Sequence, residues 1–230
     1  RRRGINAYAT QVSAANSIEF RARQLAENVD YFIAKTHSPK VSIIAYSMGG
    51  LDARYLISSL GYADKIASLT TIATPHRAGY LADFFNRHGN IFLSAGLTAA
   101  GVLAVPGSGL ANLDFKKAGE NLSTSFLRDI FNPNNPDAAQ VFYQSWAAAV
   151  EGSSPRKVSL ILRPTWSYIN QFGLNDGIVA LEAAKWGRFR GVLPTDHFSL
   201  IDSRVPFVKN DFDAFSFFGE VAASLIEAGF

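Results

Sequence analysis

Apolar and polar positions form short blocks along the chain, in an order typical of strands that alternate with helices. Residues 41–45 are a mostly apolar run that predicts a buried strand, and residues 50–60 have the spacing of a helix that Gly61 ends. Residues 66–73 predict the next strand. This order predicts parallel pairing with right-handed crossovers, and hence an α/β fold whose ligands bind beyond the carboxyl ends of the strands.

The pattern before this unit predicts one more strand and one helix. Residues 5–12 alternate weakly between apolar and polar, as a strand does. Asn16 and Glu19 have the spacing of a capping box, which predicts a helix that runs to about Thr36. The apolar stripe of this helix comprises Ala22, Leu25, Val29, Phe32 and Ile33.

Residues 77–135 differ in character and indicate an insertion. A short helix is expected at about 81–87, followed by an apolar stretch rich in Gly and Ala at 91–110 and a turn cluster at 132–136 that ends the insertion. Two interpretations are open: an inserted helix pair packed on the domain, or a movable lid over an apolar cleft. We favour the lid, because a stretch interrupted so often by small residues makes a poor rigid core element.

The remaining pattern predicts a strand at 157–162, an irregular segment at 163–177, a helix at 178–185 and a terminal helix from about 213 to 228. The phenylalanines near the C-terminus have the spacing of core residues. No shift in composition separates a second domain. We therefore expect residues 1–230 to form a single domain with a mostly parallel, doubly wound sheet and a lid-like insertion at about 77–135.

Composition and charge exclude several classes of protein. Hydrophobic residues are 48% and charged residues 18% of the 230, which argues against disorder. The net charge of +3 is spread along the chain, so nucleic acid is not an expected partner. The absence of cysteine excludes disulfides and thiolate metal sites. No apolar run is long enough to span a membrane, and the first residues are too polar for a signal peptide.

Ser47 is the candidate nucleophile. It lies in Ala45-Tyr46-Ser47-Met48-Gly49, directly after a predicted strand and directly before a predicted helix. At such a turn the backbones of strand and helix pass so closely that only small residues fit two positions to either side, and the backbone of the serine is strained. The required small residues are Ala45, Gly49 and Gly50.

A serine hydroxyl is a weak nucleophile, so it needs an imidazole to accept its proton. His197 is the best candidate, because it lies in a loop near the end of the domain, in the usual chain order for this architecture. His76 follows a predicted strand and is the alternative base, although its loop comes early. His37 and His88 are interpreted as structural residues of a turn and of a last helical turn.

The imidazole in turn needs a carboxylate that fixes its tautomer. Asp176, in Asn175-Asp176-Gly177, lies between nucleophile and base in sequence and is the candidate acid, although the same tripeptide is also a common turn. Asp196 is expected to be solvated or to cap a helix, because sequential neighbours such as Asp196 and His197 seldom point at each other. Asp52 and Asp64 lie too close to Ser47 in sequence to reach the later loop.

These motifs, in this order, resemble the α/β-hydrolase triacylglycerol lipases of bacteria and fungi. Residues 46–55 are similar to the nucleophile turn and following helix of that family, residues 69–77 to its Thr-Pro-His segment, and residues 175–179 and 184–197 to its catalytic acid and histidine loops. The resemblance implies an α/β-hydrolase fold, hydrolysis of lipid esters by Ser47, His197 and Asp176, and an oxyanion held by the backbone N–H of Met48. It also implies action at a lipid–water interface and an extracellular location.

The chain departs from the family pattern at three places. Ala45 replaces a glycine and is small enough to be tolerated. Ser199 stands where many bacterial members have a calcium-binding aspartate, so no such ion is expected. The family also has an earlier strand that ends in a His-Gly loop with a second oxyanion donor. We expect upstream polypeptide to supply both, since residues 1–230 form an N-terminally incomplete domain in this comparison.

The leading interpretation is thus a lipase or carboxylesterase that needs no cofactor. The same three residues would also serve a thioesterase or an acyltransferase, and the motifs do not separate these reactions. A third alternative is a non-catalytic relic that binds hydrophobic ligands.

Overall fold

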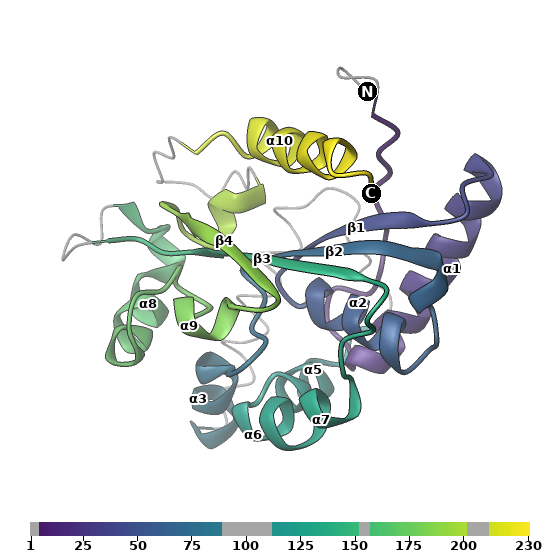
Figure 1. The fold of residues 1–230 in the computed structure, drawn as a ribbon. Helices are drawn as coiled ribbons and strands as arrows, with labels where there is room; N and C mark the ends of the chain where they lie inside the picture. The colour runs from purple at the N-terminus through teal and green to yellow at the C-terminus, as the bar shows by residue number, and fades with distance from the viewer. Residues whose placement is uncertain (1–4, 89–111, 152–156, 202–211) are drawn as a thin grey trace.

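The core of the molecule is a parallel sheet of four strands in the order β1-β2-β3-β4. A computed structural model describes residues 5–88, 112–151, 157–201 and 212–230. All four strands point in the same direction, so their carboxyl ends lie at the same edge of the sheet (Figure 1). Their bounds are Val41–Tyr46, Ile66–Ile72, Phe142–Ala148 and Arg188–Leu193.

Helices of very different length connect and cover these strands. The α-helices are α1 (Ile18–Thr36), α2 (Gly49–Ser58), α3 (Tyr80–His88), α5 (Phe115–Asn121), α6 (Thr124–Phe126), α7 (Asn132–Asn134), α8 (Arg163–Ile169), α9 (Leu181–Ala184) and α10 (Ala214–Glu227). A π-helical turn, η2, is Leu127–Phe131, and short 3₁₀ turns are η1 (Ala63–Lys65), η4 (Leu160–Leu162), η5 (Asn170–Phe172) and η6 (Phe198–Ile201).

The sheet is covered on both faces. Alternate residues of β1 point to opposite sides: Ala45 packs in the cluster formed with α1 and α2, and Ile44 packs in the cluster that includes the phenylalanines of α10. Figure 1 shows α10 on one side of the sheet and α1 and α2 on the other. Parallel strands with helices on both faces form a doubly wound α/β fold, as the sequence predicts.

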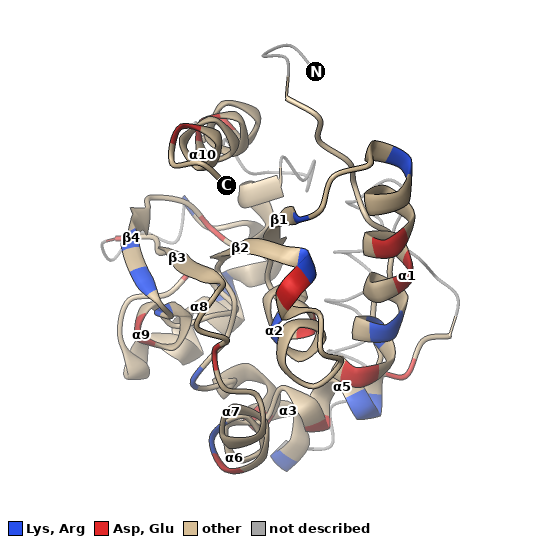
Figure 2. Ribbon diagram, turned by 45° about the vertical axis from the view of Figure 1, so that its right-hand side comes forward, with Lys and Arg blue, Asp and Glu red and all other residues tan. Residues whose placement is uncertain are grey.

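Helix α1 follows the predicted pattern with a small shift at its start. Its N-cap is Ser17, whose hydroxyl accepts a hydrogen bond from the Phe20 amide at 3.2 Å, while the Asn16 side chain accepts from the Ser17 amide instead. Ala22, Leu25 and Val29 are buried, and Phe32 and Ile33 are half-buried. Acidic and basic residues are mixed along the length of the helix (Figure 2). The predicted helix is therefore confirmed, with its cap one residue later.

The strand expected at residues 5–12 is wrong. These residues form no regular element, and a segment of the chain is a strand only where a neighbouring strand takes its backbone hydrogen bonds. Tyr8 stacks on Phe32 of α1, with ring centroids 4.6 Å apart, so the segment is held by packing on the helix. Weak alternation of apolar residues thus gave a false signal.

The second half of the sheet was not identified from sequence. The strand expected at 157–162 is a loop that leads into η4, and β3 lies earlier, at Phe142–Ala148. Gln144 and Ser145 at the centre of β3 break its apolar pattern, but both are buried with partners: Gln144 donates to Thr70 Oγ1 at 2.8 Å and Ser145 to the Trp186 carbonyl at 2.7 Å. Paired polar groups therefore concealed a central strand.

Other expected boundaries also change. The segment at 163–177 contains α8 and η5, the helix at 178–185 shrinks to α9, and β4 lies where no element was predicted. The turn cluster at 132–136 begins as helix α7, which continues directly from η2. Helix α3 confirms the one at 81–87, and the stretch 91–110 lies outside the described residues.

A buried ion pair joins the first two helices. The guanidinium of Arg21 on α1 donates to both carboxylate oxygens of Asp52 on α2, at 2.7 to 3.2 Å, and also to the Ser13 carbonyl. The side chains are 8% and 1% exposed. Since the geometry is bidentate and a backbone carbonyl takes a further N–H, each charge is compensated inside the protein.

We expect Arg21→Met to lower the free energy of unfolding by about 3 to 5 kcal/mol, because it leaves the Asp52 carboxylate buried without its cation. Urea denaturation measures the change. The matched control is Arg23→Met, which removes the exposed pair with Glu19 on the same helix and should change stability little. An equal effect of the two substitutions would contradict the assignment.

Candidate active site

Ser47 lies at the turn between β1 and α2 in a strained backbone conformation. Its φ angle is +53°, in the left-handed region that non-glycine residues seldom adopt. Two hydrogen bonds hold it there: the Ser47 amide donates to the Ile72 carbonyl at 2.9 Å, and the Thr74 hydroxyl donates to the Ser47 carbonyl at 2.7 Å. The turn therefore presents the serine side chain at the carboxyl end of the sheet.

Of the small residues that the sequence provides, Gly50 is the one that this turn requires. A methyl group added at Gly50 would lie 2.3 Å from Thr74 Oγ1 and 2.9 Å from Thr71 Cγ2. Gly49 is less crowded, since the nearest atom to an added methyl group would be the Ala45 side chain at 3.9 Å. Close approach of α2 to the end of β2 thus fixes the identity of Gly50.

The structure brings together the three side chains expected from the sequence. His197 Nε2 lies 2.9 Å from Ser47 Oγ, and His197 Nδ1 lies 2.7 Å from Asp176 Oδ2. These residues are 150 and 21 positions apart in the chain and come from three different loops. An alcohol, an imidazole and a carboxylate in this order form the arrangement that activates a serine for attack on an acyl group.

The carboxylate of Asp176 is fully buried and fixed by the backbone. Its Oδ1 accepts hydrogen bonds from the amides of Ile178 at 2.9 Å and Val179 at 2.7 Å, which leaves Oδ2 for the imidazole. The His197 amide also donates to the Asp176 carbonyl at 2.8 Å. The turn formed by Asn175-Asp176-Gly177 therefore orients the carboxylate toward His197, so the tripeptide is a turn that also carries the candidate acid.

Asp196 has a different role from its neighbour. It is buried rather than solvated: Oδ2 accepts from the amide and the hydroxyl of Ser159, both at 2.6 Å, and Oδ1 accepts from the Ser199 amide at 2.9 Å. It thus caps η6, as one of the two alternatives proposed, and ties the His197 loop to the segment after β3. Sequence reasoning missed Ser159, because nothing in its local pattern indicates a distant partner.

A large apolar cavity opens beside Ser47. Its volume is about 1720 Å³, and Ser47, Met48 and His197 contribute to its lining. Residues of α3, of α5 and of the loop after Asp176 line it as well. The apolar side chains in its lining include Leu81, Phe85, Leu122, Ile178, Val179 and Phe198. Within the described residues the backbone N–H of Met48 makes no hydrogen bond, so it is free to donate to a bound group.

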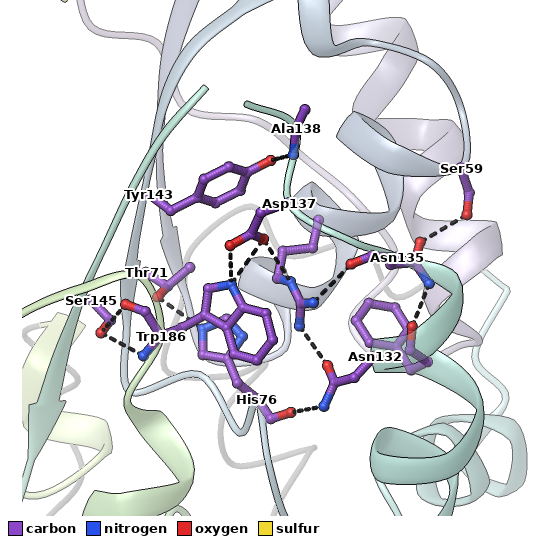
Figure 3. A network of polar contacts seen from close by, with 12 residues as sticks. Ser59, Thr71, His76, Asn132, Asn135, Asp137, Ala138, Tyr143, Ser145 and Trp186 are labelled. Atoms are coloured by element: carbon purple, nitrogen blue, oxygen red, sulfur yellow. Dashed lines mark hydrogen bonds and ion pairs between the residues drawn. The ribbon is translucent and has the colours of Figure 1, made fainter. Parts of the chain in front are cut away.

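The alternative base, His76, lies apart from this arrangement. It is fully buried, its Nε2 is 2.9 Å from Thr71 Oγ1, and its ring stacks on Trp186 at 5.2 Å (Figure 3). Burial, together with the positive charges of Arg54 and Arg77, holds the pKa of His76 well below its usual range. His37 is the exposed C-cap of α1, and His88 is the last residue of α3.

Arg54, on the helix that follows Ser47, joins the surroundings of His76 into one network. Its guanidinium carbon lies 3.6 Å from the centroid of the Trp186 ring, and it donates to Asn132 Oδ1 at 2.8 Å and to the Asn135 carbonyl at 2.9 Å. Figure 3 shows Asn132, Asn135 and Trp186 grouped around one centre. Burial lowers the pKa of Arg54 to about 10, against the opposing effect of Asp137. This network therefore supports helix α2, which follows the Ser47 turn.

The structure describes no metal centre or membrane span. In the described ranges, no three His, Asp or Glu side chains come together as metal ligands would. None of the helices that the structure describes combines the length and hydrophobicity needed to cross a bilayer.

Comparisons with known proteins agree on one family and one fold. Residues 6–130 match the family described as "Putative serine esterase (DUF676)". Triacylglycerol lipase 2 of Saccharomyces cerevisiae is 31% identical over 209 residues, which cover 87% of this chain and 59% of the yeast protein. The chain therefore spans well under two thirds of that relative.

Two solved structures are similar in fold. The mature form of Bacillus licheniformis lipase BlEst2 has a TM-score of 0.66 at 21% identity, with 90% of this chain and 75% of that chain covered. Staphylococcus hyicus lipase has a TM-score of 0.70 at 15% identity, with 99% and 86% covered. At identities of 15% and 21%, the similarity shows the fold alone, which is the α/β-hydrolase fold that the sequence predicts.

The burial of His76 predicts a pH dependence of stability. Its pKa is lowered in the folded state, so below about pH 6.5 the unfolded chain binds a proton that the folded chain does not. Stability that is fully present above pH 6.5 is then lost as the pH falls, by up to about 1.4 kcal/mol per pH unit.

We expect His76→Gln to remove this part of the slope, measured by urea denaturation at intervals from pH 8 to pH 5. The control is His37→Asn, which changes an exposed histidine and should leave the slope as it is. Parallel slopes for the His76 variant and the unmodified protein would show that another group is responsible.

Proposed function

Because the chain belongs to the DUF676 serine esterase family, we propose that it is a serine hydrolase that cleaves carboxylic esters of lipids. One observation carries the proposal: the hydrogen-bonded chain from Asp176 through His197 to Ser47 ends beside a large apolar cavity. A relic that only bound ligands would have no need of this alignment.

The geometry supports a reaction in two halves. In the first, Ser47 Oγ attacks the acyl carbonyl carbon while His197 Nε2 accepts the hydroxyl proton and Asp176 stabilises the resulting imidazolium. The N–H of Met48 donates to the oxyanion. The imidazolium then protonates the departing alkoxide, which leaves an acyl-enzyme and an alcohol.

In the second half, water replaces the alcohol. His197 accepts a proton from the water as its oxygen attacks the acyl-enzyme, and returns a proton to Ser47 Oγ as the acid product leaves. The net reaction adds one water to one ester, and the enzyme ends as it began. No electron acceptor or metal takes part in these steps.

The cavity supports a lipid substrate. The cavity also extends along the outer edge of β1, so its lining beside Ser47, and not its total volume, is the evidence for the substrate. The lining beside Ser47 comes from aliphatic and aromatic side chains such as Leu81, Phe85 and Val179, which favour a hydrocarbon chain over a polar substrate. The names of the yeast and bacterial relatives are consistent with this chemistry.

We also propose that a further strand pairs with the outer edge of β1. Among the described residues β1 pairs only with β2, although its composition is apolar on both faces, as in an interior strand. The opposite edge strand, β4, carries the exposed charges Arg188 and Arg190 that protect an edge. The cavity follows β1 between residues of α1 and α10, so a strand has room there.

The strand that fits is polypeptide of the same protein outside residues 1–230. The yeast relative extends well beyond the region it shares with this chain, which provides the length. A loop at the carboxyl end of such a strand would lie beside Met48 and is suited to supply a second oxyanion donor.

The test of the reaction is covalent labelling of Ser47 by a lipophilic phosphonate ester, together with hydrolysis of esters and thioesters of increasing acyl length. Ser47→Ala should abolish labelling, and Asp176→Asn should lower the rate of ester hydrolysis on the order of 10⁴-fold through loss of the correct imidazole tautomer. Asp196→Asn is the matched control, because Asp196 is a buried carboxylate like Asp176 and is the neighbour of His197, but does not bond to the imidazole.

An unmodified protein that remains unlabelled would refute the proposed reaction. Labelling that survives in His197→Ala would refute the assignment of the base. A preference for thioesters over esters would move the proposal to thioester hydrolysis on the same three residues.

The test of the added strand is hydrogen exchange of the β1 amides in residues 1–230 alone and in the longer natural polypeptide. We expect the outward amides of β1 to exchange rapidly in the former and to be protected in the latter, with β4 unchanged between the two. Equal protection of β1 and β2 in residues 1–230 alone would contradict the proposal.

A further inference from the structure

Tyr46, the residue directly before Ser47, contacts the residue assigned as the base. Its hydroxyl donates a hydrogen bond to the backbone carbonyl of His197 at 2.8 Å, across 151 positions of sequence. Its ring also packs on the imidazole, with centroids 4.8 Å apart and planes inclined at 37°. One side chain therefore contacts both the backbone and the ring of His197.

These contacts matter because His197 does not lie in a regular element. It lies between the end of β4 at Leu193 and the short turn η6, so no helix or strand ladder fixes its backbone. Besides the contact of its Nε2 with Ser47 Oγ, His197 makes two contacts with Asp176 and two with Tyr46. Asp176 holds the Nδ1 side of the ring, and Tyr46 lies on one of its faces.

Tyr46 is suited to connect the base with the nucleophile. As the last residue of β1 it is part of the sheet, and its backbone continues into Ser47. Its side chain lies in the cluster on the α10 side of the sheet, with Ile72, Leu193 and Phe217. The distance between Ser47 Oγ and the imidazole thus depends on a contact made by the neighbour of the serine.

The hydroxyl of Tyr46 remains a donor over the working range of the protein. Burial, and after it the nearby carboxylates of Asp176 and Asp196, raises the pKa of Tyr46 well above its usual range. The phenol of Tyr46 therefore stays protonated at neutral pH and can donate its hydrogen bond.

We propose that Tyr46 is a positioning residue for His197: its hydroxyl and ring together fix the imidazole in line with Ser47 Oγ. This inference rests on the proposed hydrolytic function. It assigns Tyr46 no contact with the reacting atoms. Its effect is on the fraction of molecules in which His197 can accept the serine proton.

The experiment uses Tyr46→Phe, which removes the hydroxyl and keeps the ring, and Tyr46→Leu, which removes both. The number of competent sites is first titrated with the phosphonate ester, and kcat and KM are then measured per titrated site. We expect Tyr46→Phe to lower kcat about tenfold at unchanged KM and unchanged melting temperature, because a misaligned base slows proton transfer and does not weaken substrate binding. Tyr46→Leu should lower kcat further.

The matched control is Tyr62→Phe. This substitution also removes one tyrosine hydroxyl and its hydrogen bond, to Asp30 at 2.7 Å, but Tyr62 lies at the surface near the start of β2, away from His197. Its kcat per titrated site should equal that of the unmodified protein.

The outcomes separate the inference from the function on which it rests. Labelling of the unmodified protein, with kcat per titrated site unchanged in Tyr46→Phe, would overturn the positioning role and leave the hydrolytic function intact. The same holds if Tyr46→Phe lowers only the melting temperature. Failure of the unmodified protein to react with the phosphonate would overturn both.

Discussion

The site depends on one constraint, which is that all four strands are parallel and end at the same edge of the sheet. Ser47 follows β1, Thr74 follows β2, and His197 follows β4, so three loops from distant parts of the chain meet beyond that edge. A strand slipped by one residue would turn its side chains to the opposite face and would separate the serine from the imidazole. Strand register thus sets the distances on which any reaction here depends.

Buried polar groups hold the loops in this arrangement. The Thr74 hydroxyl holds the carbonyl of Ser47, Tyr46 holds that of His197, and the His197 amide holds that of Asp176. Each of the three residues of the site is therefore fixed through its backbone as well as through its side chain. Because a buried donor without an acceptor is costly, such contacts specify one conformation of the loops rather than several.

Two buried arginines also stabilise this arrangement, although neither contacts the three residues of the site. The pair of Arg21 and Asp52 fixes α1 to the helix that follows the serine turn, and Arg54, two residues further along α2, is held by Trp186 and by two asparagines. Both arginines are compensated by partners from other segments. Helix α2, which follows Ser47, is thus anchored on two sides, and this anchoring is consistent with the backbone strain at Ser47.

The sequence by itself determined the features that depend on local chemistry: the small residues around Ser47, the strands at either end of α2, the two long helices, and the identity of three chemically suited side chains. It did not determine β3 or the absence of a strand at residues 5–12. Gln144 and Ser145 become core residues only because Thr70 and Trp186 supply partners, whereas residues 5–12 pack on α1, where Tyr8 stacks on Phe32. Tertiary structure alone decided that Asp196 pairs with Ser159, that His76 is buried away from the serine, and that Tyr46 contacts His197. The physical reason is that local pattern reflects the conformational preference of a segment, whereas the burial of a polar group depends on partners that only the folded chain brings within hydrogen-bonding distance.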